Sequence, residues 1–541
     1  MHKFINIHLM INIKRIVILI LLFAFNVQSQ SYKENDFDIS RKNFKLKLRD
    51  DVSLDCTSFT PNIAKPLTGF PCIVYCHGFG KTKEDNLANA AAYARFGFIT
   101  FTFSMRGQGN SEGESNLISE IEADDLKDVI DYIKKDILVD KKRIAVIGSS
   151  QGGIVPLMAA CDGLDVNCLI SDLISPDFAS NWIGNGCIKM SLLWSLSYSP
   201  DIVRYNNEVK SFRNWILSGK RDKWDSLLYC IPRQRDFSSS INENKIPVFI
   251  SNSFEDKYFS SNSIIENLSN FSENTKFYFG AIEGHGSITT EDEDAYHDKS
   301  MKEWLDKHLN NIDPDEKINF AASLSSLPIE NNIWSFQRLY SNTSLFENAS
   351  RIKFYLHPSN IITELPYIGD TTSFTFKNII TDSTFTMNEA VNFEFRGDYF
   401  DLKFIKQRLV FDSEPLVWNY NVLGIPKLHL VYKSGKPVCQ FNFQIYEVFS
   451  DGTSKFVSSI NYTDRNYVKG KLKKTDISGD ALGHIFTAHN KIRIVLTNLD
   501  TREYDNFLRS NPYVLPVLES SVNIIYTGGK EGSYIELPLK E

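Results

Sequence analysis

The sequence predicts an α/β fold, a doubly wound sheet with a helical cap insertion, followed by an all-β jelly-roll domain. From residue 44 to residue 309, short β-branched apolar runs typical of buried strands alternate with helical stretches. This alternation breaks at about residues 176–245, where four tryptophans accompany helical patches without a strong strand, as expected for a cap. Past residue 334, short alternating runs with turn signals and no long helix indicate a jelly roll.

Residues 1–29 have the pattern of a signal peptide. Lys14 and Arg15 precede an unbroken apolar run over residues 16–25, and Ser29 offers a small residue for cleavage. The apolar run is shorter than the roughly 20 residues that a membrane-spanning helix needs. We therefore expect a secreted or periplasmic protein without a membrane span after signal cleavage.

The chain of 541 residues is too long for a single hydrophobic core. We place the α/β catalytic domain, with its cap, at residues 30–313 and the C-terminal β-sandwich at residues 330–541. A net charge of −7 and the lack of a long basic run argue against nucleic acid as a partner. No cysteine or histidine spacing resembles a zinc site, so we expect no metal and no cofactor. The cysteines allow two disulfide bridges that the sequence does not assign, Cys187 with Cys230 or Cys161 with Cys168.

A glycine-rich turn over residues 148–153 lies between a predicted strand, residues 143–147, and a predicted helix. A Gly-x-Ser-x-Gly pattern at a strand-to-helix turn is the nucleophile elbow of α/β-hydrolases. Gly148 and Gly152 would let the strand and helix approach each other, so that Ser150 presents its hydroxyl near the helix N-terminus. The pattern predicts Ser150 as a nucleophile. The alternative is a glycine-rich turn with an incidental serine.

A serine hydroxyl needs a neighbouring base, and in this fold the base follows the acid along the chain. His285 stands between two glycines in the loop after the predicted strand at residues 276–280. His297 and His308 fall within the helix that follows. The pattern therefore predicts His285 as the catalytic base, against the alternative of a histidine on a surface loop.

The third member of a triad is a carboxylate that fixes the tautomer of the base. Asp256 lies in the loop after the predicted strand at residues 246–251, where this fold places the acid. Its neighbour Glu255 is expected at the surface, and Asp222 comes too early, in the cap. We predict Asp256 as the acid.

An oxyanion hole needs two preorganised hydrogen-bond donors. The backbone N–H of Gln151, directly after the nucleophile, is one predicted donor. The backbone N–H of Phe79, after His77 and Gly78, is the other. We expect His77 to pack under this loop and Arg106 to brace the site structurally.

Several motifs resemble the cocaine-esterase and X-Pro dipeptidyl-peptidase hydrolases. In the catalytic domain these are the turn at residues 106–113, the elbow at 148–153, the Asp256 loop ending in Tyr258-Phe259, and Gly-His-Gly at 284–286. In the second domain, residues 410–416, 446–452 and 533–539 are similar to that family's C-terminal jelly roll. The resemblance implies Ser150, Asp256 and His285 as the triad. Those families often place a tyrosine side chain in the oxyanion hole. Residues 77–80 instead resemble the loop of general α/β-hydrolases, whose oxyanion hole is formed by backbone N–H groups alone.

These motifs predict an exported serine hydrolase that cleaves an acyl ester or amide through an acyl-enzyme, on a small-molecule or short-peptide substrate. The alternatives are an X-Pro dipeptidyl-peptidase, which is a serine aminopeptidase, and a non-catalytic binding protein on a hydrolase scaffold. An aminopeptidase needs a carboxylate for the substrate ammonium, and no cap carboxylate stands out by its setting. The cap is instead rich in aromatic residues, which favours a neutral acyl group: Trp182, Trp194, Tyr198, Tyr205, Trp215, Trp224 and Tyr229. The sequence leaves the oligomeric state open.

Overall fold

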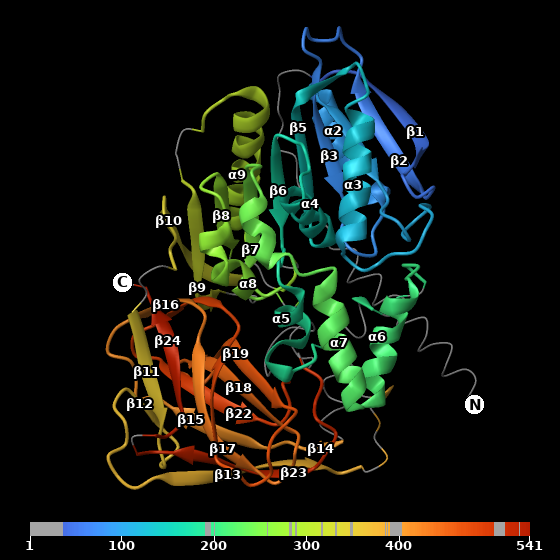
Figure 1. Cartoon of the computed structure of the whole chain (residues 1–541). Helices are drawn as coiled ribbons and strands as arrows, with labels where there is room; N and C mark the ends of the chain where they lie inside the picture. The colour runs from blue at the N-terminus through green and yellow to red at the C-terminus, as the bar shows by residue number, and fades with distance from the viewer. Residues whose placement is uncertain are drawn as a thin grey trace, which may run out of the picture.

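The computed structural model describes residues 36–540, except 190–195, 198, 200, 257, 281–283, 287–288, 315–317, 330–332, 347–349, 383, 385, 387, 390–402, 502–513 and 530. An α/β domain lies on top of a β-sandwich, with a group of helices beside the junction (Figure 1). The predicted signal peptide, residues 1–29, falls outside the described residues. Within the described ranges, no helix is long and apolar enough to cross a membrane.

One twisted sheet forms the centre of the α/β domain. Its strand order is β1, β2, β4, β3, β5, β6, β7, β8, β9, β10. The pairs from β4–β3 to β8–β9 are parallel, and both ends of the sheet are antiparallel. The strands are β1 (Ile39–Lys47), β2 (Ser53–Pro61), β3 (Phe70–Cys76), β4 (Ile99–Phe103), β5 (Val139–Ser149), β6 (Cys168–Asp172), β7 (Val248–Ser253), β8 (Thr275–Gly280), β9 (Phe320–Ile329) and β10 (Ile333–Ser341).

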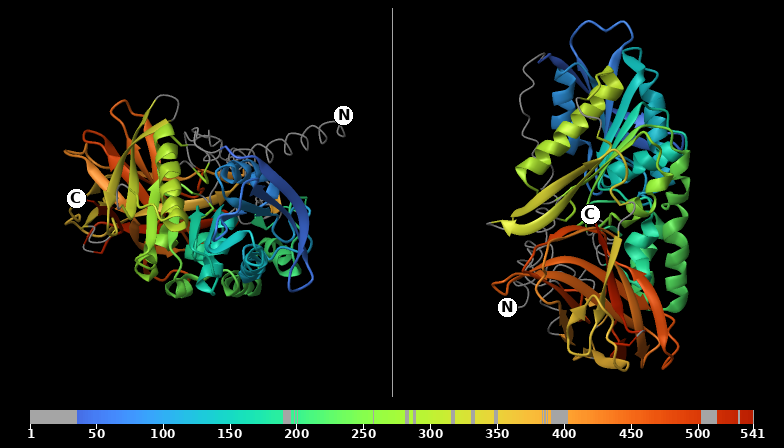
Figure 2. Two further views of the ribbon diagram at one scale, coloured as in Figure 1. Left: turned by 90° about the horizontal axis from the view of Figure 1, so that it is seen from above. Right: turned by 90° about the vertical axis from the view of Figure 1, so that its left-hand side faces the viewer.

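Helices cover both faces of this sheet. The helices α2 (Leu87–Arg95) and α9 (Glu291–Asn310) pack on one face, and Figure 2 shows α9 lying across it. The helices α3 (Glu120–Ile133) and α4 (Gln151–Cys161) pack on the other face. Because both faces are covered, β3 and β6 are buried along their whole length, which explains the continuous apolar run of β3.

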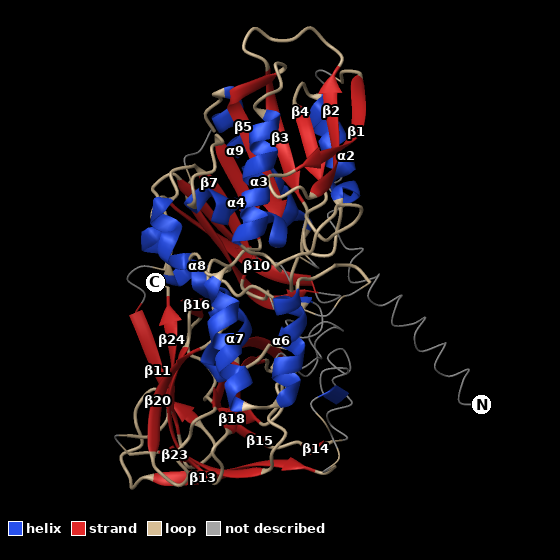
Figure 3. Cartoon of the chain, turned by 45° about the vertical axis from the view of Figure 1, so that its right-hand side comes forward, coloured by secondary structure: helices blue, strands red, loops and turns tan. Residues whose placement is uncertain are grey.

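The segment between β6 and β7 is helical, as predicted for the cap. Its helices α6 and α7 run down alongside the sandwich (Figure 3). The cap elements are α5 (Phe178–Ile183), η2 (Gly184–Gly186), α6 (Asn207–Ser218), α7 (Arg221–Arg233) and η4 (Ser238–Glu243). The short helices η1 (Lys83–Asn86), α8 (Asn262–Glu266) and η5 (Leu268–Asn270) complete the α/β domain.

The C-terminal domain is a sandwich of two antiparallel layers around its own apolar core. The first layer contains β11 (Ser350–Leu356), β12 (Ile362–Thr363), β13 (Thr372–Ile380), β14 (Phe404–Ile405), β16 (Tyr420–Gly424), β17 (Lys427–Ser434), β20 (Lys473–Ser478), β21 (Leu482–Phe486), β23 (Ser521–Thr527) and β24 (Tyr534–Leu539). The second contains β15 (Arg408–Asp412), β22 (Lys491–Thr497), β18 (Cys439–Val448) and β19 (Ser454–Asp464). The predicted fold class is confirmed.

The boundary between the domains lies further along the chain than the sequence predicts. The sandwich was expected from residue 330, but β10 pairs with β9, and β9 pairs with β8 of the catalytic sheet. The first strand of the sandwich is therefore β11. Short alternating strands do not reveal which sheet they join, because pairing depends on partners that are distant in the sequence.

The sandwich contacts the loops that follow β7. The Asn262 side chain donates to Gly479 O at 2.7 Å and accepts from Ala481 N at 2.7 Å. A Cβ atom at Gly483 would lie 2.5 Å from the Phe254 ring, so the strand β21 packs directly on this loop. The Arg465 guanidinium donates to Gly186 O and lies 4.1 Å from the Trp224 ring centroid in the cap. The second domain thus supports both the cap and the loop after β7.

All eight cysteines lie within the described residues, and each is a free thiol. Neither of the two bridges that the sequence allowed is present. Burial raises the pKa of Cys56 and of Cys187 to about 12. These side chains act as small apolar residues.

We expect a chain that ends after Asp313 to be insoluble or inactive. Such a chain loses the whole sandwich and also β9, whose Phe320 ring packs 5.4 Å from Phe277 and 5.7 Å from Phe279. The exposed edge of β8 and the uncovered apolar surface would favour aggregation. Soluble yield and ester turnover measure the effect, and a soluble fragment with full activity would contradict it.

Candidate active site

The predicted nucleophile stands in a sharply bent turn between β5 and α4. Ser150 has φ 59° and ψ −128°, a conformation that is strained for a residue with a side chain. A Cβ atom at Gly148 would lie 2.2 Å from Gly152 O, and one at Gly152 would lie 2.2 Å from Cys76 O. Both positions must therefore be glycine, and the structure has the strand–turn–helix arrangement that the motif predicts.

Hydrogen bonds on both sides hold Ser150 in this conformation. Its backbone N–H donates to Asp172 O at 2.9 Å, across to the end of β6. Its carbonyl accepts from the N–H groups of Gly153 and Ile154, each at 2.9 Å, at the start of α4. The turn is thereby fixed to the sheet and to the helix, with the hydroxyl at the helix N-terminus.

His285 and Asp256 meet as the sequence predicts. His285 Nδ1 lies 2.6 Å from Asp256 Oδ2, and Asp256 Oδ1 accepts from the N–H groups of Tyr258 at 2.7 Å and Phe259 at 3.0 Å. The Asp256 side chain is fully buried, while that of His285 is 20% exposed. Because a carboxylate only accepts, Nδ1 carries the proton and Nε2 is left free to act as a base.

The elbow and the histidine loop lie at the same edge of the sheet, after the parallel strands β5 and β8. A Cβ atom at Gly286 would lie 3.2 Å from Leu173 Cδ1, so the histidine loop packs against Leu173. Leu173 directly follows Asp172, whose carbonyl accepts the hydrogen bond from Ser150 N–H. Within the described residues, Ser150 Oγ and His285 do not share a hydrogen bond. Catalytic hydrogen bonds are often long until substrate binds, so this geometry is compatible with a triad.

The two predicted oxyanion donors lie beside the elbow. A Cβ atom at Gly78 would be 3.8 Å from Ser150 Cβ, which places the loop at residues 77–80 against Ser150. In the described part of the chain, neither Phe79 N–H nor Gln151 N–H has a hydrogen-bond acceptor. Two free N–H groups next to a serine are what an oxyanion hole requires.

His77 packs under this loop. Its Nδ1 lies 2.8 Å from Gly78 O, and its Nε2 accepts from Met105 N at 2.8 Å. Burial lowers the pKa of His77 to about 4, so the ring is neutral at pH 7. The proton must then be on Nδ1, where it donates to the Gly78 carbonyl. His77 is therefore a structural support of the loop.

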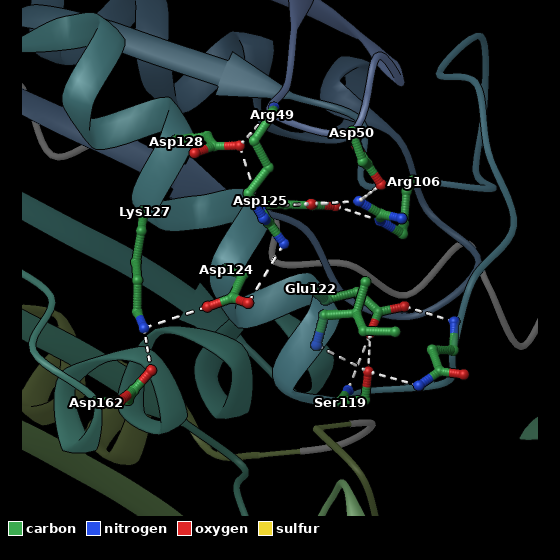
Figure 4. A network of polar contacts seen from close by, with 12 residues as sticks. Arg49, Asp50, Arg106, Ser119, Glu122, Asp124, Asp125, Lys127, Asp128 and Asp162 are labelled. Atoms are coloured by element: carbon green, nitrogen blue, oxygen red, sulfur yellow. Dashed lines mark hydrogen bonds and ion pairs between the residues drawn. The ribbon is translucent and has the colours of Figure 1, made fainter.

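Arg106 is also structural. Its Nε and Nη2 atoms donate to the carboxylate of Asp125 on α3 at 2.5 Å, and Nη2 donates to Asp50 at 2.9 Å (Figure 4). Burial raises the pKa of Asp125 to about 6, although the guanidinium opposes this shift. The arginine ties the turn at residues 106–113 to α3 and to the turn between β1 and β2.

Aromatic rings surround the candidate triad. The Tyr205 ring from the cap stacks on Phe79 at 6.3 Å. The His285 imidazole has the rings of Tyr258 at 5.1 Å and Phe259 at 5.6 Å. Phe178 of the cap packs 5.9 Å from Phe259 and 4.8 Å from Trp182. Of the other predicted cap aromatics, Trp215 and Trp224 are partly buried, Tyr229 is exposed, and Trp194 and Tyr198 lie outside the described residues.

The acidic side chains of the cap are otherwise engaged or exposed. Asp177 accepts from Ser180 N at 3.0 Å and caps α5. Glu208 pairs with Arg233 at 2.5 Å. The other five cap carboxylates, Asp201, Asp222, Asp225, Asp236 and Glu243, are exposed. Among these seven, none is a buried carboxylate without a partner.

The structure adds residues that sequence reasoning missed. The Asp172 carboxylate at the end of β6 accepts from Ser251 Oγ at 2.6 Å and lies 3.2 Å from His297 Nε2. The sequence places His297 in a helix and indicates no contact with Asp172. The available signal is the pair of polar residues, Ser171 and Asp172, at the end of a buried strand. The described residues contain no group of three or more histidine, cysteine, aspartate or glutamate side chains that could hold a metal ion.

The strand order and the elbow define the catalytic domain as an α/β-hydrolase. Residues 50–286 match the family model of the X-Pro dipeptidyl-peptidases (S15 family). This match confirms the resemblance to the cocaine-esterase and X-Pro dipeptidyl-peptidase hydrolases, and it supports a hydrolase activity.

Solved structures share the two-domain fold. A CocE/NonD family hydrolase from Staphylococcus aureus is 12% identical with a TM-score of 0.67, and the alignment covers 93% of each chain. An aminopeptidase from a marine sediment Thaumarchaeota archaeon is 14% identical with a TM-score of 0.70, covering 96% of this chain and 99% of that one. At such identities the likeness shows the fold alone.

Among curated proteins, an uncharacterized 31.7 kDa protein from the traX-finO intergenic region of Escherichia coli is 34% identical over 134 residues. The match covers 24% of this chain and 47% of that protein. The chain thus spans about half the length of the curated relatives it matches.

Replacing Asp256 with Asn should lower kcat by about 10⁴, because an amide at this position favours the wrong tautomer of the base. Steady-state kinetics on a nitrophenyl ester measure the loss. Glu255→Gln, one residue away, is the matched control and should leave kcat nearly unchanged. A larger loss in Glu255→Gln than in Asp256→Asn would assign the acid to the neighbouring residue.

Proposed function

We propose that the protein is an exported serine hydrolase that cleaves a neutral acyl ester or amide. The hydrogen bond between His285 and the buried Asp256, next to the strained serine turn, carries this proposal. The family match supports hydrolysis in general. The basic and apolar pattern of residues 14–29 supports export.

In the proposed reaction, His285 Nε2 accepts the proton of Ser150 as its Oγ attacks the substrate carbonyl carbon. Asp256 stabilises the imidazolium that forms, and it keeps the ring oriented through Nδ1. The N–H groups of Phe79 and Gln151 donate to the oxyanion. The imidazolium then protonates the leaving alcohol or amine, and a water molecule, activated by His285, hydrolyses the acyl-enzyme.

The surroundings of the triad favour an uncharged acyl group. The rings of Phe79 and Tyr258 are partly exposed beside the triad, and the buried rings of Tyr205 and Phe259 pack nearby. Burial of a ring or alkyl group against such apolar surface stabilises a complex without a charge partner. A substrate ammonium would need a desolvated carboxylate, and the seven cap carboxylates cap a helix, pair with an arginine or are exposed.

A second candidate function is release of X-Pro dipeptides. The observation that favours it is the family model, which is named for that activity. The two candidates share the triad and differ in whether the substrate must carry a free amino group.

We expect short aromatic or aliphatic nitrophenyl esters to have higher kcat/KM values than Gly-Pro and Ala-Pro nitroanilides on the same enzyme. The reason is that ester acyl groups are uncharged. In Ser150→Ala, turnover should fall to near background, a loss on the order of 10⁶.

Two results would overturn the proposal. A nitroanilide with a kcat/KM above those of all the esters, abolished by blocking its amino group, would favour the peptidase. Retention of more than a few per cent of the activity in Ser150→Ala would exclude the serine mechanism.

A further inference from the structure

We infer that Gln108 is a positioning residue for the oxyanion hole. Its side-chain Oε1 accepts a hydrogen bond from the backbone N–H of Gly80 at 2.8 Å. Gly80 directly follows Phe79, whose N–H is one of the two proposed donors. The inference rests on the proposed serine mechanism and adds a residue outside the triad.

The loop that carries Phe79 is a tight turn. Lys81 N–H donates to Gly78 O at 3.2 Å, and Gly80 has φ 73°. A positive φ at the third residue is the mark of a type II turn, which differs from type I by a flip of the central peptide. In this turn the central peptide joins Phe79 to Gly80, and its N–H is the group that Gln108 holds. Gln108 therefore fixes the peptide next to the proposed donor.

The other side of the loop is held by His77. Its ring bonds to Gly78 O at 2.8 Å and to Met105 N at 2.8 Å. The N–H of Phe79 lies between these two supports and has no acceptor among the residues that the structure describes. An oxyanion hole gains its effect from donors that are already oriented before the reaction. Two hydrogen-bonded supports, one on each side, supply that orientation.

Gln108 is itself held rigidly. Its side chain is fully buried, and it belongs to the turn at residues 106–113 that Arg106 ties to Asp125. Gly107 O accepts from Arg204 N of the cap at 2.9 Å, and Gln108 forms an isolated β-bridge with Val203. The cap thus braces the turn that presents the amide oxygen to Gly80. Because Gly80 N–H donates, the contacting atom of Gln108 must be its oxygen.

The test replaces Gln108 with Met, which has a similar shape but lacks the acceptor. Kinetics on a neutral nitrophenyl ester should show a kcat that is lower by about 10- to 100-fold, less than or comparable to the loss on removing a whole oxyanion donor. KM should stay within about threefold, since the ground-state carbonyl uses this donor weakly. Affinity for an arylboronic acid, which forms a tetrahedral adduct with serine, should fall by a factor similar to that of kcat.

Ser111→Ala is the matched control. Ser111 belongs to the same turn and bonds to Asp55 N at 2.8 Å and Ser104 O at 2.5 Å, away from the oxyanion loop. We expect this variant to lower the urea midpoint of unfolding while kcat and boronic acid affinity stay unchanged. A parental kcat in Gln108→Met, or an equal loss in Ser111→Ala, would overturn the inference.

A further variant covers the case in which Gln108→Met does not fold. Gln108→Asn keeps a neutral amide in this buried position, but its shorter side chain cannot reach Gly80, so its kcat should also fall. A parental kcat in Gln108→Asn would contradict the inference. If the serine mechanism itself is wrong, the unmodified enzyme will not bind the boronic acid. If only the inference about Gln108 is wrong, the unmodified enzyme will be inhibited and the Gln108 variants will bind the boronic acid equally well.

Discussion

The candidate site depends on a turn that has no room for side chains next to its serine. Gly148 and Gly152 contact each other and Cys76 so closely that a Cβ atom at either would overlap with backbone. This close packing forces Ser150 into a conformation that costs about 1–3 kcal/mol. Hydrogen bonds to Asp172 O, Gly153 N and Ile154 N offset that cost. The candidate nucleophile Ser150 is thus fixed by its backbone, and its hydroxyl has no hydrogen bond within the described residues.

The support of this turn extends through the sheet to α9, the helix that follows the His285 loop. Asp172 holds Ser150 N–H with its carbonyl, while its carboxylate accepts from Ser251 and pairs with His297 on α9. Burial alone would lower the pKa of His297, but Asp172 raises it overall, which favours a buried ion pair. Because α9 begins just after the His285 loop, this pair connects the Ser150 turn with that loop. On the other side, the sandwich packs on Phe254 through Gly483, two residues before Asp256.

Local patterns explain why the fold class and the positions of Ser150, Asp256 and His285 could be predicted from the sequence. The Ser150 turn is set by a strand, two glycines and a helix within about a dozen residues, and the fold class follows from the same periodicity. His285 and Asp256 follow from the order of the strands, and the structure brings them together at 2.6 Å. The contacts of Gln108 with Gly80 and of Asp172 with His297 join residues 28 and 125 positions apart, and no local pattern encodes them. The placement of β9 and β10 was missed for the same reason.

The most direct test of the central claim is labelling with a fluorophosphonate followed by peptide mapping. The probe reacts with a serine only where a base and an oxyanion hole activate it. We predict one adduct per chain, on Ser150, and a labelling rate that falls sharply in His285→Ala. An intact native enzyme that hydrolyses esters but is not labelled, or that carries its adduct on another serine, would contradict the account.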